Sequence, residues 1–270
     1  MHYSELAPHP RLRPFVRTYW TLSGRALDFP PQPVLPDGCT ELIVHRAQPF
    51  FRFDADGAAF AQTTRMFAGQ LQAPIVLAPG GDADLVSVRF EPFGAHALLG
   101  IDQSLLADCV VDADQLGAPW LTRAMRAAES RDTAEAALAE IERALIGRLD
   151  TLRRPHTDAR VVRAAHAIMQ RDGAMTVDVA AAEAALTPRH LERLFQKHIG
   201  TTPKRFARVL RFQAAANRVL SAEAPALVDV SAETGYFDQA HMIKDFVIFA
   251  GTTPGQFDER LGALTRVMLS

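Results

Sequence analysis

The chain has 270 residues, 48% of them hydrophobic and 22% charged, with a formal net charge of −2 at pH 7. Its length predicts two domains of roughly 150 residues, each able to bury a core. No apolar run approaches the roughly 18 residues of a membrane span, and the N-terminus lacks the features of a signal peptide, which argues against a membrane or exported protein. We therefore expect a cytoplasmic protein whose cysteines, Cys39 and Cys109, are reduced thiols.

Residues 1–100 are expected to form short strands. Segments rich in β-forming residues alternate with turn signals such as Pro36-Asp37-Gly38 and Pro79-Gly80-Gly81. The predicted strands span residues 41–45, 49–53, 65–67, 75–77 and 85–90. Several short strands at this spacing predict a small β-barrel or sandwich, of cupin-like form.

Helices are predicted to follow at residues 93–100, 114–128 and 133–149. The last carries an apolar stripe made of Ala134, Leu138, Ile141, Leu145 and Leu149. This stripe fits packing on the strands, which is the commoner use, or a dimer contact. Residues 1–150 would thus form the first domain, β-rich to residue 100 and helical from 101, and residues 151–157 a linker.

A repeat dominates the C-terminal part. At a constant offset of 51, TPRHLERLFQKHIGTTPKRF at residues 187–206 matches DQAHMIKDFVIFAGTTPGQF at residues 238–257. Upstream, Ala181 is expected to match Ala232 at the same offset. Matching glycine, proline and phenylalanine positions predict that one supersecondary unit occurs twice.

Each copy has the signals of a helix-turn-helix. Thr187 and Asp238 are good N-caps, and Gly200 and Gly251 are expected C-caps. Shorter helices are predicted before them at 177–184 and 227–233, and one long helix at 204–220 joins the two units. Two recognition helices so held could enter adjacent major grooves roughly 34 Å apart. The expected fold class is α+β with two domains, the second all-α.

Charge is concentrated in the first copy. Residues 185–218 hold eight basic residues and one acid, whereas residues 219–270 hold three basic and seven acidic residues. A basic face of this kind fits DNA phosphates, although most charge runs are solvated helix faces. A plain helical solenoid needs three or more repeats, so two copies with a basic cluster favour DNA binding.

At these residues the sequence resembles the AraC/XylS family of transcription regulators. The resemblance is carried by LTPRHLERLF at 186–195, GTTPKRF at 200–206, GYFDQAH at 235–241 and GTTP at 251–254. It implies a seven-helix DNA-binding domain over residues 158–262, followed by a tail at 263–270.

The resemblance also implies which residues meet DNA. The base-contacting positions would be Arg189, Glu192, Arg193, Gln239, Ala240, Ile243 and Lys244. Phosphate contacts are expected from Lys197, Lys204, Arg205 and Thr187, since such contacts give affinity without sequence information. Arginine can bond both acceptors of a guanine edge, which suits the first set.

The second unit departs from the family pattern. Val247 and Ile248 stand where basic residues are usual. We therefore expect the first unit to supply most of the DNA affinity, and the second to contact bases weakly or to offer an apolar patch to a protein. Ala185 replaces the usual glycine in the first turn, which must avoid positive φ or carry strain.

The N-terminal half resembles a domain found ahead of AraC-type modules, on the motifs LPDGCTEL at 35–42, Gly69-Gln70 and VRFEP at 88–92. By architecture it would be the sensor or dimerisation half. The polar residues expected in an effector pocket are Cys39, Glu41, His45, Arg89 and Glu91. The expected partners are double-stranded DNA, RNA polymerase, a small-molecule effector and a second copy of the chain.

Enzyme motifs are missing from the sequence. It has no GxGxxG, Walker loop, HExxH or GxSxG, so we expect no catalytic site, metal or cofactor. Two alternatives stay open. One is a ligand-independent dimeric regulator. The other is a thiol-reactive sensor or repair-type protein using Cys39, although zinc–cysteine repair domains need four thiols.

Overall fold

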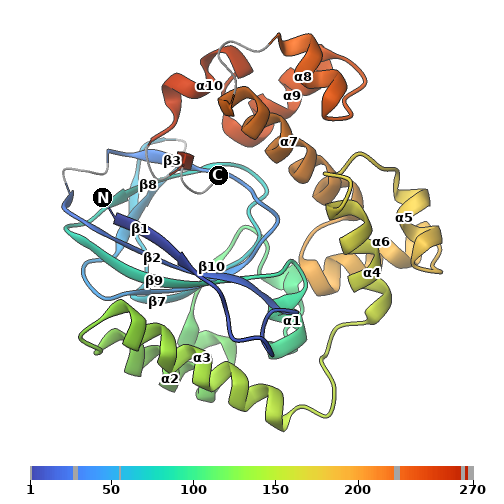
Figure 1. Cartoon of the computed structure of the whole chain (residues 1–270). Helices are drawn as coiled ribbons and strands as arrows, with labels where there is room; N and C mark the ends of the chain where they lie inside the picture. Colours follow the sequence, from blue (N-terminus) through green and yellow to red (C-terminus); the bar gives the residue numbers. More distant parts are fainter. Residues whose placement is uncertain (1, 27–29, 55, 222–225, 263–264, 267–270) are drawn as a thin grey trace.

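The computed structural model describes residues 2–26, 30–54, 56–221, 226–262 and 265–266 (Figure 1). The N-terminal part is β-rich. Its strands are β1 (His2–Leu6), β2 (Val16–Gly24), β3 (Gln32–Val34), β4 (Glu41–His45), β5 (Phe50–Phe53), β6 (Ala59–Ala61), β7 (Arg65–Ala68), β8 (Ile75–Pro79), β9 (Ala83–Phe90) and β10 (Val110–Asp112). All five predicted strands are present, and the sequence interpretation missed the other five.

These strands form two antiparallel sheets that are not closed into a barrel. The larger has the order β1-β2-β9-β4-β7-β10, and the smaller the order β3-β8-β5-β6. The central strands of the larger sheet, β2, β9 and β4, are buried on both faces. On β9, Val86 and Val88 point to one side, while Leu85 and Arg89 point to the other, because successive side chains of a strand alternate.

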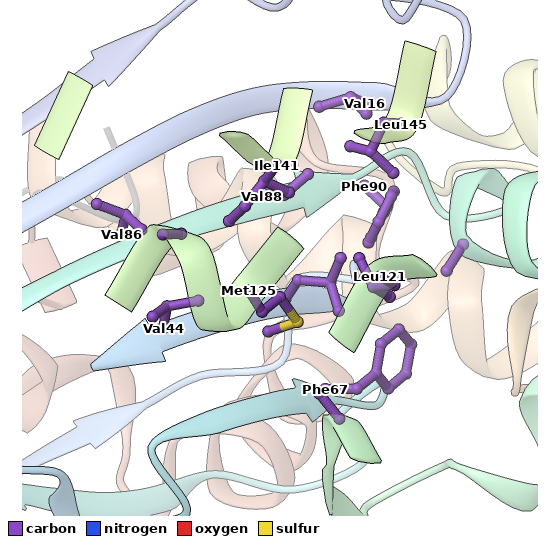
Figure 2. Close-up of a cluster of buried hydrophobic side chains, with 14 of the residues drawn as sticks. Val16, Val44, Phe67, Val86, Val88, Phe90, Leu121, Met125, Ile141 and Leu145 are labelled. Atoms are coloured by element: carbon purple, nitrogen blue, oxygen red, sulfur yellow. The ribbon is translucent and has the colours of Figure 1, made fainter. Parts of the chain in front are cut away.

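Two helices cover the outer face of the larger sheet. They are α2 (Pro119–Glu129) and α3 (Ala134–Thr151), which lie beneath the sheet in Figure 1. From α3, Leu138, Ile141 and Leu145 are buried against sheet residues, as Figure 2 shows for Ile141 and Leu145. The apolar stripe of this helix therefore packs within the chain.

The helix expected at 114–128 starts later than predicted. Residues Ala113–Leu116 form a short 3-10 helix, and α2 begins at Pro119. Gly117 between them has a left-handed φ of 65°, which ends the first turn. The short helix α1 (Gly94–Leu99) matches its prediction within one residue at each end.

The C-terminal part contains seven helices among the described residues, as the family resemblance implied. They are α4 (Ala159–Met169), α5 (Val177–Glu183), α6 (Pro188–Ile199), α7 (Pro203–Ser221), α8 (Leu227–Glu233), α9 (Gln239–Ala250) and α10 (Pro254–Arg260). Two apolar cores lie along α7, one around Phe195 and Phe206 and one around Phe212 and Phe246. Each core belongs to one half of the repeat.

The two parts of the chain touch at several places. The rings of His96 on α1 and His198 on α6 lie 4.2 Å apart, and Leu35, next to β3, belongs to the core around Phe212. Of the expected tail, only residues 265 and 266 are described, and Thr265 donates to the carbonyl of Pro33. The rest of that tail lies outside the described residues. No helix in the described ranges is apolar over a length that would span a bilayer.

Candidate nucleic-acid interface and ligand cavity

The first helix-turn-helix consists of α5 and α6. The hydroxyl of Thr187 accepts a hydrogen bond from the backbone N–H of His190, and Pro188 occupies the first helical position. Gly200 ends α6 with a φ of 90°. The inward face of α6 is Leu191, Leu194, Phe195 and Ile199, and its exposed face is Arg189, Glu192, Arg193, Gln196 and Lys197. The predicted base-contacting side chains thus share one solvent face.

The second unit has the same construction with a different surface. Asp238 caps α9 by accepting from His241 N at 2.7 Å, and Gly251 ends it with a φ of 68°. The positions predicted to contact bases, Gln239, Ala240 and Lys244, are exposed, and Ile243 is half-buried. Farther along the same face, Val247 and Ile248 are 51% and 40% exposed. Apolar side chains here can bind neither phosphates nor polar base edges.

The two units do not align at one offset throughout. The first helices, α5 and α8, begin 50 residues apart, whereas α6 and α9 begin 51 apart. The turn of the second unit is therefore one residue longer. The predicted match of Ala181 with Ala232 is wrong, because Ala181 is buried and Ala232 is exposed. Ala181 corresponds to the buried Ser231.

Ala185 carries strain in the first turn. It adopts a φ of 54°, which costs a residue with a Cβ roughly 1 kcal/mol relative to glycine. In the second unit, Gly235 takes the comparable position with a φ of 75°. The sequence allowed either a turn that avoids positive φ at Ala185 or a strained turn, and the structure has the strained turn.

Half of the basic cluster is bound within the protein. The four arginines of α7 each have a partner: Arg205 the carbonyl of Gln72, Arg208 the carboxylate of Asp245, Arg211 the carbonyl of Gly235, and Arg218 the carboxylate of Glu233. Among the described residues, the side chains of Arg189, Arg193, Lys197 and Lys204 make no hydrogen bond or ion pair. The unpaired charge of the first unit therefore lies on α6 and at the start of α7.

The pair of Arg208 and Asp245 was not predicted. Asp245 is fully buried on α9, and its Oδ1 accepts from Arg208 Nη2 at 2.6 Å. The guanidinium of Arg208 also lies 5.4 Å from the ring of Phe249. The sequence does contain a sign of this pair: Asp245 stands at an inward-facing position of the second recognition helix, where the first has the buried Leu194.

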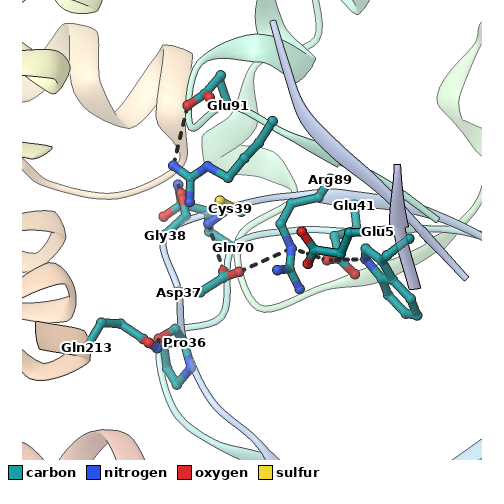
Figure 3. Close-up of polar contacts among 12 residues, drawn as sticks. Glu5, Pro36, Asp37, Gly38, Cys39, Glu41, Gln70, Arg89, Glu91 and Gln213 are labelled. Carbon is teal, nitrogen blue, oxygen red and sulfur yellow. Dashed lines mark hydrogen bonds and ion pairs between the residues drawn. The ribbon is translucent and has the colours of Figure 1, made fainter. Parts of the chain in front are cut away.

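A cavity lies between the two sheets. It has a volume of about 90 Å³, well above the roughly 10–15 Å³ that a single water needs. Its lining is mostly apolar and includes Trp20, Leu22, Ile43, Phe50, Met66, Leu77 and Leu85. Four of the five predicted pocket residues also line it, namely Cys39, Glu41, His45 and Arg89. Glu91 does not, and its carboxylate instead pairs with Arg17 at 3.3 Å (Figure 3).

The charged groups of the cavity contact one another, with two carboxylates facing one guanidinium. Oε1 of Glu41 accepts hydrogen bonds from Arg89 Nε at 2.7 Å and from the Trp20 indole at 3.0 Å. Asp37 lies 3.6 Å from the same guanidinium. Burial raises the pKa of Glu41, while Arg89 opposes that rise. The cavity therefore has no unpaired charge among these groups.

His45 is the exception to this pairing. Its side chain is only 2% exposed, and Gln62 is its one hydrogen-bonding neighbour among the described residues, at a geometry too poor for a strong hydrogen bond. Burial lowers the pKa of His45 to about 4, so the imidazole is neutral at pH 7. It offers one donor and one acceptor inside an apolar space.

Lowering the pH is expected to destabilise the protein through His45. The unfolded chain, with a pKa near 6.5, binds this proton more readily than the folded chain. The free energy of unfolding should therefore fall between pH 6.5 and pH 4, by about 2 kcal/mol at pH 5 from this residue. Urea unfolding at pH 7 and pH 5 measures it. A His45→Gln variant with the same pH dependence as the wild type would contradict this assignment.

Cys39 is expected to resist alkylation in the folded protein. Its side chain is buried, and burial raises the pKa of its thiol although Arg17 opposes the rise. Cys109 is exposed. Iodoacetamide should thus label Cys109 first and Cys39 only after unfolding, as peptide mass spectrometry would report. Equal labelling rates in the native protein would favour the thiol-sensor alternative.

Two family models match the sequence. Residues 4–112 match a family described as "Domain of unknown function (DUF6597)", and residues 180–260 match one described as "Helix-turn-helix domain". No curated protein matches closely enough to count as a relative.

Several solved structures resemble the chain at low identity. ToxT from Vibrio cholerae is 8% identical, with 90% of this chain and 98% of that chain covered and a TM-score of 0.48. The xylose-binding transcription activator XylR is 17% identical over 46% of this chain and 39% of its own, with a TM-score of 0.33. The AraC-like transcriptional activator CuxR is 15% identical over 82% and 86%, with a TM-score of 0.29.

Both helix-turn-helix units observed in the structure fall within the matched range of residues 180–260, apart from the first three residues of α5. Strands β1 to β10 fall within the other match, apart from the first two residues of β1. The chain therefore combines a DUF6597 domain with a helix-turn-helix domain, which supports a DNA-binding transcription regulator.

Proposed function

We propose that the chain binds specific DNA mainly through α6, with α9 as a weaker second contact. The observation that supports this is the difference between the two exposed faces. On α6, Arg189 and Arg193 are exposed without a partner among the described residues, whereas Ala240 and Lys244 hold the matching positions of α9. Farther along, α9 presents Val247 and Ile248 where α6 has Gln196 and Lys197. We expect α6 to contribute more of the sequence-specific affinity than α9, because an arginine side chain can bond a guanine edge at two atoms.

Both units are held by one helix. The 19 residues of α7 span about 28 Å at 1.5 Å per residue, close to the roughly 34 Å between successive major grooves. In Figure 1, α7 runs from α6 towards α9. Lys197 and Lys204, at and just beyond the C-terminal end of α6, then supply phosphate contacts beside the first groove. The hydroxyl of Thr187, at the N-terminal end of α6, supplies another at the opposite end of the helix.

Selection of bound DNA from a random pool tests this function. We expect one sharply defined half-site and a second, weakly defined half-site about one helical turn away. Two equally defined half-sites would contradict the weaker role of α9. If the selection enriches no sequence, specific binding itself is refuted. Val247 and Ile248 would then remain available to a protein such as RNA polymerase, which an Ile248→Lys variant tests by transcription in vitro.

We also propose that the N-terminal domain senses a small molecule in the cavity between its sheets. The buried imidazole of His45 supports this: Gln62 can satisfy only one of its two ring nitrogens, and a buried polar atom without a partner is costly until water or a ligand bonds it. The paired charges of Glu41 and Arg89 and the apolar lining favour a compact, uncharged ligand with one polar group.

Mass spectrometry of protein purified from its native host tests the sensor. A retained molecule that is lost from a His45→Leu variant supports it. An empty cavity, with unchanged melting temperature in a metabolite screen, would instead favour the ligand-independent dimeric regulator. Sedimentation equilibrium would then show whether a second copy binds.

A further inference from the structure

The DNA-binding domain is docked on the N-terminal domain through α7. Arg205 Nη2 donates to the backbone carbonyl of Gln72, and Gln213 Nε2 donates to the carbonyl of Pro36 at 2.5 Å. Figure 3 shows Gln213 reaching Pro36 from the helical part. Both acceptors are carbonyl groups of loops beside β3 and β8, and the two donors lie eight residues apart on one helix.

The surfaces around these two hydrogen bonds fit closely. A methyl group at Gly38 would lie 2.8 Å from Cε2 of Phe206, so only glycine allows this approach. Leu35 is 6% exposed and packs into the core that contains Phe212. These contacts place the docked face of α7 against residues 35–38. We refer to the two hydrogen bonds and this packing as the α7 dock.

The other side of the same segments lines the cavity. Leu35 and Asp37 flank Pro36 and line it, and Leu71, next to Gln72, does so too. A displacement of these side chains would move the carbonyl groups that hold Arg205 and Gln213. The dock and the cavity therefore share one wall.

Arg205 is in an unusual place for a residue of the basic cluster. It belongs to the first turn of α7, directly after the exposed Lys204, at the helix end that attracts anions. Its guanidinium instead lies 5.5 Å from the ring of Phe249 and bonds a neutral carbonyl. Burial lowers its pKa, with the neighbouring Arg208 acting in the same direction. The docked position thus gives this guanidinium no anionic hydrogen-bond partner among the described residues, and its Nε is buried without a hydrogen bond.

We propose that the α7 dock is a latch that withholds Arg205 from DNA phosphate. When the dock opens, Arg205 exchanges the carbonyl of Gln72 for a phosphate oxygen, beside the contact made by Lys204. The exchange is favourable because hydrogen bonds between two charged groups are stronger than those to a neutral acceptor. This inference goes beyond the proposed DNA binding. Only its link to the cavity depends on the proposed sensor.

A Gln213→Glu variant opens the latch without removing volume. The new carboxylate faces the Pro36 carbonyl, and two acceptors repel where a hydrogen bond stood. The control is Asn217→Asp, which makes the same amide-to-acid change at an exposed position of α7. Each is combined with Arg205→Gln, and DNA affinity is titrated at several salt concentrations on the selected sequence.

The expected result is tighter binding when the latch opens. Gln213→Glu should bind about three- to tenfold more tightly than Asn217→Asp, with a salt slope steeper by about 0.9, the value of one added phosphate contact. Arg205→Gln should abolish that gain but change wild-type affinity less than about twofold, because Arg205 is already withheld. Small-angle scattering should show a larger radius of gyration for Gln213→Glu.

Three results would overturn the latch. The first is equal affinity of Gln213→Glu and Asn217→Asp despite a larger radius of gyration. The second is a gain that survives Arg205→Gln. The third is a large loss from Arg205→Gln alone. If Gln213→Glu fails to fold, Gln213→Leu, which also lacks the donor, replaces it. A loss of affinity in Arg193→Ala, measured in parallel, shows that DNA binding itself is intact whatever the latch does.

Discussion

Replacing Arg193 by alanine is expected to weaken binding to the selected DNA by about 1–3 kcal/mol, or about 5- to 150-fold. Arg193 is exposed on α6 without a partner among the described residues, so its guanidinium is available for a base edge. Replacing Lys244 on α9 should cost less than about threefold, because its neighbours on that face include Val247 and Ile248. Fluorescence anisotropy with labelled DNA measures both.

The controls separate base contacts from general charge. Arg123→Ala removes an equally exposed arginine from α2, in the N-terminal domain, and should leave affinity unchanged. Lys197→Ala should lower the salt slope by about 0.9 and weaken all sequences alike, as loss of a phosphate contact does. Equal losses from Arg193→Ala and Lys244→Ala would show that the two units contribute equally, against our proposal.

Removal of Arg208 should have the largest effect on stability. Arg208→Ala leaves the fully buried carboxylate of Asp245 without its partner, and breaking a pair of this kind costs about 3–5 kcal/mol. The upper part of that range is less expected because Arg208 is 26% exposed and water can reach the site. Urea unfolding followed by circular dichroism measures the loss of stability. The helices that pack around Phe246 should be the ones destabilised.

A second ion pair on the same helix is the matched control. Arg218 and Glu233 lie 2.7 Å apart but are about half exposed. Arg218→Ala should therefore cost far less stability than Arg208→Ala. The double variant Arg208→Met/Asp245→Leu should recover most of the stability, since no charge is left buried. A cost of Arg208→Ala no larger than that of Arg218→Ala would mean that Asp245 is satisfied in another way.

The helix-turn-helix units could be predicted because their signals are local. The capping residues Thr187 and Asp238 and the closing glycines each act within four residues of their partners. Strand β2, by contrast, was missed although it is the longest in the larger sheet. It is buried on both faces, so its sequence lacks the alternation of polar and apolar residues that indicates a strand.

Three of the pocket residues were predictable because they lie on regular strands, where alternate side chains face the same side of the sheet. Glu41 and His45 are four residues apart on β4, so they face the same side of the sheet, and Arg89 is paired with Glu41 on the adjacent strand. Glu91 follows the end of β9 at Phe90, where the alternation stops, and its side chain turns to Arg17. Alternation of side chains along a strand therefore places Glu41, His45 and Arg89 correctly, but it does not apply to Glu91, which lies beyond the end of β9.

The partners of the α7 arginines could not be predicted. Net charge counts Arg205 and Lys204 alike, but Gln72 lies 133 residues from Arg205 in the sequence, and only the folded chain brings them together. The same is true of Asp245 and Arg208, which are 37 residues apart. A basic run therefore sets an upper limit on the phosphate-facing charge, and the tertiary contacts decide how much of it is free.

The position of Leu35 has a practical consequence for truncated proteins. A fragment cut at the linker would contain all seven helices of the DNA-binding domain, yet it would lack the side chain that completes the core around Phe212 and would leave that site open to solvent. Such a fragment should be less stable and more prone to aggregate than the same helices in the full chain. Its affinity for an operator would describe the fragment alone, and reporter assays with deletions at residues 151–157 would mix lost regulation with lost folding.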